Sequence, residues 1–263
     1  MEETKFKDKR INYVIQGEGE PLFLVHGYLE TLEIWDEFAE ALAGDYKVIR
    51  MDLPGHGKSE VIQETHDMEL LAEVANALLE ENQIFSCTMI GHSMGGYVTL
   101  AFADLYPEKL KRFSLFHSHP FPDSAQVKEN RQKAIENIKN GKKEEICRTH
   151  IPKTFAEDNI NAFAGQVERA QGFALKAPEE GIIANLKGMM KRPDRSSLVK
   201  HTEKPFLLIA GKKDNFIDYD TVIPKIELPG KGELVALEHS GHMGFIEEKQ
   251  KSLDVIKAFI KKQ

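Results

Sequence analysis

The stretch that most constrains this chain is a short apolar run that turns sharply into a helix. It spans Thr88–Gly96 and has Ser93 at its apex, with Gly91 and Gly95 two residues away on either side. Glycine has no Cβ, so two backbone segments can approach each other closely at such a turn. The pattern predicts a serine that projects at the carboxyl end of a sheet, beside the positive end of the following helix.

Apolar runs typical of buried strands alternate with amphipathic helical segments along most of the chain. A hairpin is expected within residues 5–15, with its turn at 8–10. Further strands are expected at 22–25, 46–51, 88–91, 112–116, 205–211 and 234–238, and helices at 34–43, 67–81, 93–105 and 247–261. This alternation predicts an α/β fold with a mostly parallel, eight-stranded sheet flanked by helices.

The alternation breaks between residues 120 and 200, where charged, mostly helical segments are separated by glycine and proline. We expect residues 1–119 and 201–263 to form the core domain and residues 120–200 to form an inserted helical cap. Such an insertion is expected over the carboxyl edge of the sheet, where α/β proteins bind their ligands.

Bulk composition excludes several classes of function. A chain of 263 residues can bury a large core without staples, and Cys87 and Cys147 make no disulfide framework. A formal net charge of −7 argues against a general nucleic-acid binder. No apolar run reaches the roughly 18 residues of a membrane span, and the charged N-terminus does not resemble a signal peptide. We expect a cytoplasmic protein of undetermined oligomeric state.

A serine hydroxyl is a weak nucleophile and needs a base that is oriented by an acid. Asp214 closely follows the apolar run that ends at Gly211, and His242 follows the run that ends at Glu238. Both side chains are therefore expected at the same edge of the sheet as Ser93. We predict Ser93 as nucleophile, His242 as base and Asp214 as orienting acid, with no metal or cofactor required.

Taken together, these motifs resemble the α/β-hydrolase superfamily, in its single-chain form with a helical cap after the sixth strand. The chain order serine, aspartate, histidine is also that of these enzymes. The resemblance is carried by His26-Gly27-Tyr28, Asp52–Ser59, Gly91–Gly96, Gly211–Asp214 and Ser240–His242. It implies an oxyanion hole made from the backbone N–H groups of Tyr28 and Met94, where unpaired donors stabilise negative charge.

The resemblance also suggests supporting roles for other residues. His26 is expected to support the oxyanion loop, and His56 and His92 are interpreted as structural. Residues 117–119 follow the sixth strand and are expected near the site or at its rim. Asp123 is an alternative acid, because some relatives carry the acid after that strand.

Several reactions of this superfamily fit the sequence poorly. Epoxide hydrolases and haloalkane dehalogenases have an aspartate where this chain has Ser93, and the cap lacks the tyrosines that epoxide hydrolases use. A related menaquinone-pathway synthase has an arginine where this chain has Tyr97. A serine hydrolase of carboxylic esters with small to medium acyl groups fits best. Carbon–carbon bond hydrolysis, lactone opening and a non-catalytic ligand receptor stay open.

The cap is expected to choose the substrate. Phe121, Phe155, Met189 and Met190 are candidates for an apolar acyl pocket, although the same residues could simply pack the cap together. Residues 120–200 contain fifteen Lys or Arg and eleven Asp or Glu, a net charge of +4 in an otherwise acidic chain. Scattered charges usually form a solvated surface, and an anionic substrate is the alternative interpretation of this excess.

Overall fold

A computed structural model describes residues 2–262 and contains one eight-stranded sheet, in the order β1-β2-β4-β3-β5-β6-β7-β8. Strands β1, β2 and β4 pair antiparallel, and all other neighbours pair parallel. The predicted mostly parallel α/β sheet is therefore confirmed. The strands are β1 (Glu2–Phe6), β2 (Lys9–Gln16), β3 (Glu20–Val25), β4 (Tyr46–Met51), β5 (Cys87–His92), β6 (Leu110–Phe116), β7 (Phe206–Gly211) and β8 (Gly232–Leu237).

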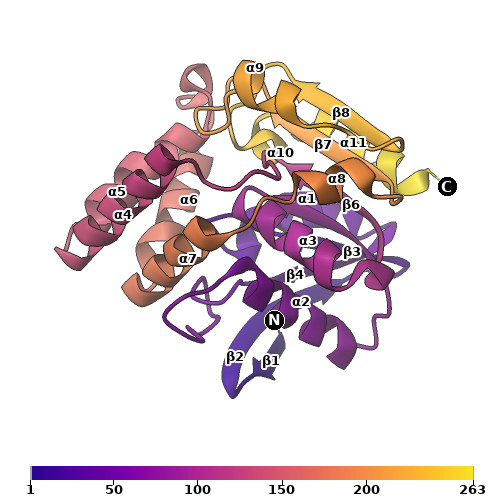
Figure 1. The fold of residues 1–263 in the computed structure, drawn as a ribbon, viewed down its shortest axis with the longest axis horizontal. Helices are drawn as coiled ribbons and strands as arrows, with labels where there is room; N and C mark the ends of the chain where they lie inside the picture. Colours follow the sequence, from indigo (N-terminus) through magenta and orange to yellow (C-terminus); the bar gives the residue numbers. More distant parts are fainter. Residues whose placement is uncertain (1, 263) are drawn as a thin grey trace.

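The central strands are apolar along their length because helices cover both faces of the sheet. On one face α1 (Asp36–Leu42) contacts α11 (Lys249–Lys261), and on the other α2 (Met68–Glu81) contacts α3 (Met94–Leu105) (Figure 1). Strands β5 and β7 are buried at every position. This rigid core fixes the positions of the loops that follow β3, β5, β7 and β8.

Two N-terminal boundaries differ from the sequence prediction. The hairpin turn lies at Lys7 and Asp8, which both have positive φ, rather than at residues 8–10. The helix expected at 34–43 begins as a 3-10 turn, η1 (Leu32–Trp35), which Thr31 caps by accepting from the Glu33 N–H. The tighter turn brings Trp35 into the core, where it is fully buried.

The final helix is also divided, into α10 (Gly244–Glu247) and α11. Glu248 interrupts it with φ −124° and ψ 51°. Its carboxylate accepts hydrogen bonds from the His239 N–H at 2.9 Å and the Ser240 hydroxyl at 2.7 Å. These contacts hold the loop before His242. The helix is therefore interrupted at Glu248, whose side chain binds that loop.

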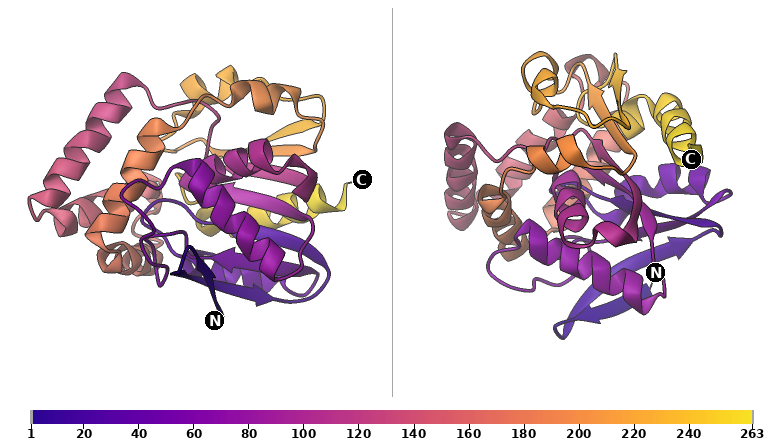
Figure 2. Two further views of the ribbon diagram at one scale, coloured as in Figure 1. Left: turned by 60° about the horizontal axis from the view of Figure 1, so that its bottom comes forward. Right: turned by 45° about the vertical axis from the view of Figure 1, so that its right-hand side comes forward.

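The segment between β6 and β7 contains only helical elements: α4 (Ala125–Lys139), α5 (Lys143–His150), η3 (Ile151–Thr154), η4 (Glu157–Asn159), α6 (Ala164–Lys176), α7 (Glu179–Lys191) and α8 (Ser196–His201). Helices α4 to α7 form a separate layer beside the sheet (Figure 2). Asn185 on α7 donates to the Pro54 carbonyl at 3.0 Å, and the His242 N–H donates to the Thr154 carbonyl at 2.6 Å. The segment thus lies against loops that follow β4 and β8, at the carboxyl edge of the sheet.

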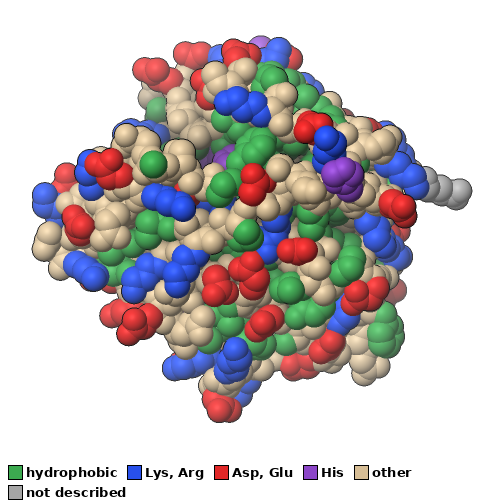
Figure 3. Space-filling view, in the orientation of Figure 1, with side chains coloured by type: hydrophobic (Ala, Val, Ile, Leu, Met, Phe, Trp, Pro, Cys, Tyr) green, Lys and Arg blue, Asp and Glu red, His purple; other side chains and the backbone are tan. Residues whose placement is uncertain are grey.

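Charge is unevenly spread over the surface. In the space-filling view, Lys and Arg are frequent over α4 to α7, whereas Asp and Glu gather over α2 and its surroundings (Figure 3). None of the helices within residues 2–262 is both long and apolar enough to cross a bilayer.

Candidate active site

Ser93 occupies a strained turn between β5 and α3, with φ 51° and ψ −115°. A non-glycine residue at positive φ is uncommon and is maintained only where its surroundings impose it. A Cβ on Gly95 would lie 2.3 Å from the Val25 carbonyl oxygen, and one on Gly91 would lie 2.3 Å from the Gly95 carbonyl oxygen. Both positions therefore need glycine, because the start of α3 presses against the ends of β3 and β5.

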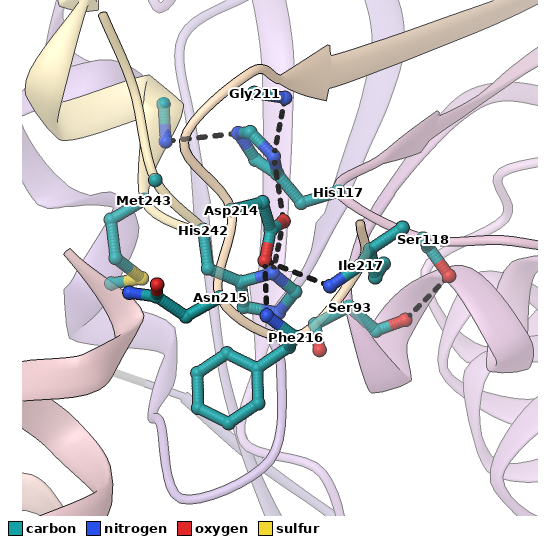
Figure 4. A network of polar contacts seen from close by, with 12 residues as sticks. Ser93, His117, Ser118, Gly211, Asp214, Asn215, Phe216, Ile217, His242 and Met243 are labelled. Carbon is teal, nitrogen blue, oxygen red and sulfur yellow. Dashed lines mark hydrogen bonds and ion pairs between the residues drawn. The ribbon is translucent and has the colours of Figure 1, made fainter. Parts of the chain in front are cut away.

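Asp214 follows β7 and His242 follows β8, and the two side chains meet (Figure 4). The His242 Nδ1 lies 2.7 Å from Asp214 Oδ2, while Asp214 Oδ1 accepts from the Phe216 N–H at 2.8 Å and the Ile217 N–H at 3.0 Å. With Nδ1 donating to the carboxylate, the basic nitrogen of a neutral His242 ring is Nε2. The arrangement suits a base that accepts its proton on Nε2.

The pair is strongly coupled electrostatically. Burial alone would raise the pKa of Asp214, but His242 and the neighbouring His117 hold the pKa of Asp214 below its usual range. Burial alone would lower the pKa of His242, but Asp214 raises the pKa of His242 above its usual value. The Asp214 carboxylate therefore stabilises the protonated histidine that general-base catalysis would create.

His92, the residue before Ser93, connects the serine turn to His242. Its Nε2 lies 2.7 Å from the His242 carbonyl oxygen, and its Nδ1 lies 3.0 Å from the buried Glu30 carboxylate. The two imidazole rings are 5.0 Å apart. Among the described contacts, no hydrogen bond joins the Ser93 hydroxyl to His242, and catalytic hydrogen bonds often tighten only with bound substrate.

His117 places a second imidazole against Asp214. Its Nδ1 lies 3.4 Å from Asp214 Oδ2, and its two ring nitrogens lie 3.1 Å from the Gly211 N and 3.0 Å from the Gly244 N. Burial lowers the pKa of His117 to about 4, which keeps the ring neutral. The sequence placed His117 near the site; the structure places it beneath Asp214, where it links the loops after β6, β7 and β8.

The backbone N–H groups of Tyr28 and Met94 face no acceptor among the hydrogen bonds of residues 2–262. Met94 begins α3, so its N–H has no partner within the helix. On either side of Tyr28 the amides are used, since Gly27 donates to Glu30 and Leu29 donates to His56. The two amides predicted for the oxyanion hole are therefore left as donors.

His26 and His56, which are interpreted from the sequence as supporting residues, contact the loops that follow β3 and β4. His26 Nε2 accepts from the Leu53 N–H at 2.9 Å, and His56 Nε2 accepts from the Leu29 N–H at 3.2 Å. Both rings are fully buried. They tie the loop after β3 to the loop after β4 and so fix the position of the Tyr28 amide.

Three of these side chains could also be considered as metal ligands. His117, Asp214 and His242 offer ligand atoms that all lie within 4.8 Å of one another. However, His242 Nδ1 is bonded to Asp214, and in the neutral His117 ring Nε2 accepts from the Gly244 N–H while the Nδ1–H faces Asp214 Oδ2. Hydrogen bonding accounts for the arrangement without an ion.

The four predicted pocket residues lie in different surroundings. Phe155 and Met189 are 0% and 2% exposed and belong to the hydrophobic core. Phe121 stacks on His119, with ring centroids 5.7 Å apart, and Met190 is partly buried against the core. Phe121 is thereby placed next to His119, and the Phe155 backbone lies against the residues beside Asp214 and His242, since its carbonyl accepts from Asn215 at 3.3 Å.

Phe216 and His150 also lie near His242 but belong to none of the motifs identified in the sequence. The Phe216 ring lies 5.3 Å from that of His242 and 4.8 Å from that of His150, and its side chain is 43% exposed at the mouth of the site. His150 also contacts the Tyr28 ring at 5.8 Å. No motif marks either residue; the only signal for Phe216 was its position two residues after Asp214.

Asp123, the alternative acid, has different partners. Its carboxylate is bound by Arg131 and Arg192, whereas the carboxylate bonded to His242 is that of Asp214. Tyr97 stands where the related synthase has an arginine. The guanidinium carbon of Arg192 lies over the Tyr97 ring, 3.8 Å from the ring centroid.

A parallel sheet with a serine at a strand–helix turn and an Asp–His pair at later strand ends is the architecture of the α/β-hydrolases. Comparison with known proteins agrees, because the family model described as "alpha/beta hydrolase fold" matches residues 20–249. The chain therefore belongs to the α/β-hydrolase family, and the resemblance inferred from its motifs is confirmed.

Individual relatives are similar at moderate identity. The dihydrolipoyllysine-residue acetyltransferase component of the acetoin cleaving system of Pseudomonas putida is 29% identical over 95% of this chain, which spans 66% of that relative. The pimeloyl-[acyl-carrier protein] methyl ester esterase of Aeromonas hydrophila is 26% identical, with 93% of this chain and 96% of the relative covered.

Among solved structures, a malate-bound thermophilic esterase from Thermogutta terrifontis superposes with a TM-score of 0.91 and 28% identity, covering 96% of this chain and 93% of that one. Relatives and structural neighbours include several named esterases, lipases and other hydrolases. These similarities indicate a hydrolytic enzyme.

Proposed function

We propose that this chain is a serine hydrolase that cleaves carboxylic esters of small to medium acyl substrates. The observation that carries the proposal is the Asp214–His242 pair, whose 2.7 Å contact leaves Nε2 as the basic nitrogen beside the strained Ser93 turn. The similarity to two named esterases supports ester bonds as the target.

In this mechanism His242 Nε2 removes the proton from the Ser93 hydroxyl as the serine oxygen attacks the ester carbonyl. The N–H groups of Tyr28 and Met94 stabilise the negative charge on the carbonyl oxygen. The protonated His242 then gives its proton to the departing alcohol. His242 next deprotonates a water molecule that attacks the acyl-enzyme, which releases the acid and restores Ser93. Asp214 keeps His242 in the required tautomer and stabilises its charged form.

We further propose that residues 1–119 and 201–263 act as the catalytic core and that residues 120–200 act as a cap that selects the substrate. The hydrogen bonds from Asn185 to Pro54 and from His242 to Thr154 support this division, because they hold the segment against the edge that carries the Asp–His pair.

A serine-directed phosphonate probe tests the mechanism. Wild-type protein should be labelled with one equivalent, and Ser93→Ala should not be labelled. Ser197→Ala is the matched control, because Ser197 is exposed on α8 and should leave labelling intact. Absence of labelling in the wild type, or equal labelling of Ser93→Ala, would refute the proposal.

A substrate panel separates the remaining alternatives. We expect p-nitrophenyl esters to be turned over faster than lactones or vinylogous diketones, with a rate that varies with acyl length. Faster lactone opening or diketone cleavage would keep the Ser–His–Asp chemistry but change the reaction. Stoichiometric binding with no turnover would instead indicate a non-catalytic receptor.

A further inference from the structure

A buried cluster of charges lies between the segment 120–200 and helix α3. Arg131 Nε and Nη2 lie 2.7 Å and 3.3 Å from the two oxygens of Asp123, and Arg192 Nη1 lies 2.6 Å from Oδ1. The side chains of Asp123 and Arg192 are only 2% and 3% exposed. Two guanidinium groups face one carboxylate, so the cluster carries one uncompensated positive charge, with Arg131 19% exposed.

The cluster adjoins the candidate active site. Arg192 lies over the ring of Tyr97, which is one helical turn beyond Ser93 on α3. Tyr97 contacts His119 at 5.7 Å, and His119 is two residues beyond His117, which contacts Asp214. A chain of contacts therefore connects the positive charge to the helix that begins after Ser93 and to the loop that contacts Asp214.

Several donors near the cluster have no acceptor among residues 2–262. The Tyr28 hydroxyl is buried and unpartnered, and no hydrogen bond is formed by Arg131 Nη1, Arg192 Nη2 or the His150 ring. Burial, the larger effect, raises the pKa of Tyr28 and lowers the pKa of His119 and His150, and Arg131 is close enough to lower the pKa of all three. The Tyr28 hydroxyl is thus a buried donor without an acceptor, beside the His150 ring and a pair of arginines that share one carboxylate.

We propose that Arg131, Arg192 and the Tyr28 hydroxyl form a carboxylate-binding subsite, so that the natural substrate is an ester that carries a free carboxylate. The half-ester of a short dicarboxylic acid has the required chemistry: one acyl carbonyl for Ser93 and one negative charge for the cluster. A carboxylate matches the single excess charge, and its two oxygens supply the acceptors that guanidinium and hydroxyl donors lack. This inference deepens the proposed ester hydrolysis and rests on it.

Binding can be tested without turnover. In Ser93→Ala protein, isothermal titration with succinate, glutarate and adipate should show binding of at least one dianion, whereas glutaramide should not bind. Adding Arg131→Gln should weaken that binding at least tenfold. Adding Lys133→Gln should not, because Lys133 lies on the same helix but is 62% exposed and paired with Glu129. Absence of dianion binding, or unchanged binding in the Arg131→Gln protein, would overturn the subsite.

Kinetics then separate the subsite from a purely structural role of the arginines. The ratio of kcat/KM for mono-p-nitrophenyl glutarate to that for p-nitrophenyl pentanoate compares an anionic and a neutral acyl group of equal length. Arg131→Gln and Arg192→Gln should each lower this ratio at least tenfold, mainly through KM, and Arg131→Lys should restore part of it. Lys133→Gln should leave the ratio unchanged.

An equal loss on both esters would assign the arginines to cap stability and overturn the inference. If neither ester is hydrolysed but glutarate still binds, ester hydrolysis fails while the anion subsite stands.

Discussion

At the scale of single residues, Asp214 has the most demanding position in the site. Its carboxylate accepts two backbone N–H groups on one oxygen and contacts two imidazole rings with the other. Those contacts outweigh the effect of burial and keep the group ionised. One carboxylate therefore shapes its own loop and sets the tautomer and basicity of His242.

Replacing the Asp214 carboxylate by an amide should separate its role in shaping the loop from its role in stabilising charged His242. Asp214→Asn can still accept the Phe216 and Ile217 N–H groups, so the protein should fold, but an amide no longer stabilises charged His242. We expect kcat to fall by about three to four orders of magnitude. Activity needs neutral His242 and rises with pH through its pKa, so the rising limb should lie above pH 6.5 in the wild type and move lower in the variant. The measurement is kcat/KM on p-nitrophenyl acetate between pH 5 and 9.

Asp254→Asn is the control, because Asp254 is exposed on α11. If Asp214→Asn keeps the wild-type rate and pH profile, another group must orient the base. Loss of the far-UV circular dichroism signal would show that the carboxylate is needed for folding and would contradict the expected separation.

The sequence alone was sufficient to predict the positions of residues that follow the ends of strands. Ser93, Asp214 and His242 follow parallel strands, and the carboxyl ends of parallel strands lie at one edge. By contrast, His150 and Arg192 reach the site through packing of a separate helical layer against the sheet. That packing joins residues distant in the chain, and no local spacing encodes it.

At the scale of elements, the site depends on how closely α3 approaches β3. A Cβ on Gly95 would lie 2.3 Å from the Val25 oxygen and 2.6 Å from the His26 oxygen, both of them backbone atoms that cannot move without shifting a strand end. We expect Gly95→Ala to lower the free energy of unfolding by about 2 kcal/mol or more, as overpacking does. It should also lower kcat, because the amide of Met94 and the serine turn shift with the helix.

Gly172→Ala provides the matched control. Gly172 lies within α6, and a Cβ there would meet nothing within 4 Å. Alanine should therefore stabilise the protein by roughly 0.5–1 kcal/mol through helix propensity. Urea denaturation measures both changes as a shift of the midpoint at constant slope. Equal midpoints for the two variants would contradict the close approach of α3 to β3.

Element boundaries were predictable where local patterns decide them. The strand at Tyr46–Met51 and the helix that ends at Leu105 occur as expected, because burial periodicity and Pro107 specify them. The break at Glu248 was not predictable, since it depends on a carboxylate that accepts from the His239 N–H and the Ser240 hydroxyl. Side chains that leave a helix to support a loop override helical periodicity.

At the scale of the whole molecule, four buried histidines connect the loops at the carboxyl edge of the sheet. His26, His56, His66 and His117 are at most 1% exposed, and each accepts a backbone N–H on Nε2. A protonated ring has no free nitrogen lone pair, so each of these hydrogen bonds requires the neutral form. Burial lowers the pKa of all four, and that of His66 and His117 to about 4.

These histidines should make the protein sensitive to mild acid. In the unfolded chain they take up protons near pH 6.5, whereas in the folded protein all four have a lowered pKa, and His66 and His117 resist protonation until about pH 4. The unfolded state therefore binds more protons as the pH falls through this window, and stability decreases. We expect the free energy of unfolding to fall by several kcal/mol between pH 6.5 and 4. His242 has a raised pKa and acts in the opposite direction, so it offsets part of the loss near neutral pH.

Urea denaturation at half-unit steps from pH 8 to 4 measures this dependence, whose slope reports the difference in bound protons between the two states. His117→Gln should make the slope shallower by up to about one proton, because one group that protonates only on unfolding has been removed. His201→Gln should leave the slope unchanged, since that side chain is exposed at the end of α8. A free energy of unfolding that stays level between pH 7 and 5 would mean that the buried rings accept protons without losing their contacts, and the acceptor roles assigned to the four Nε2 atoms would then be wrong.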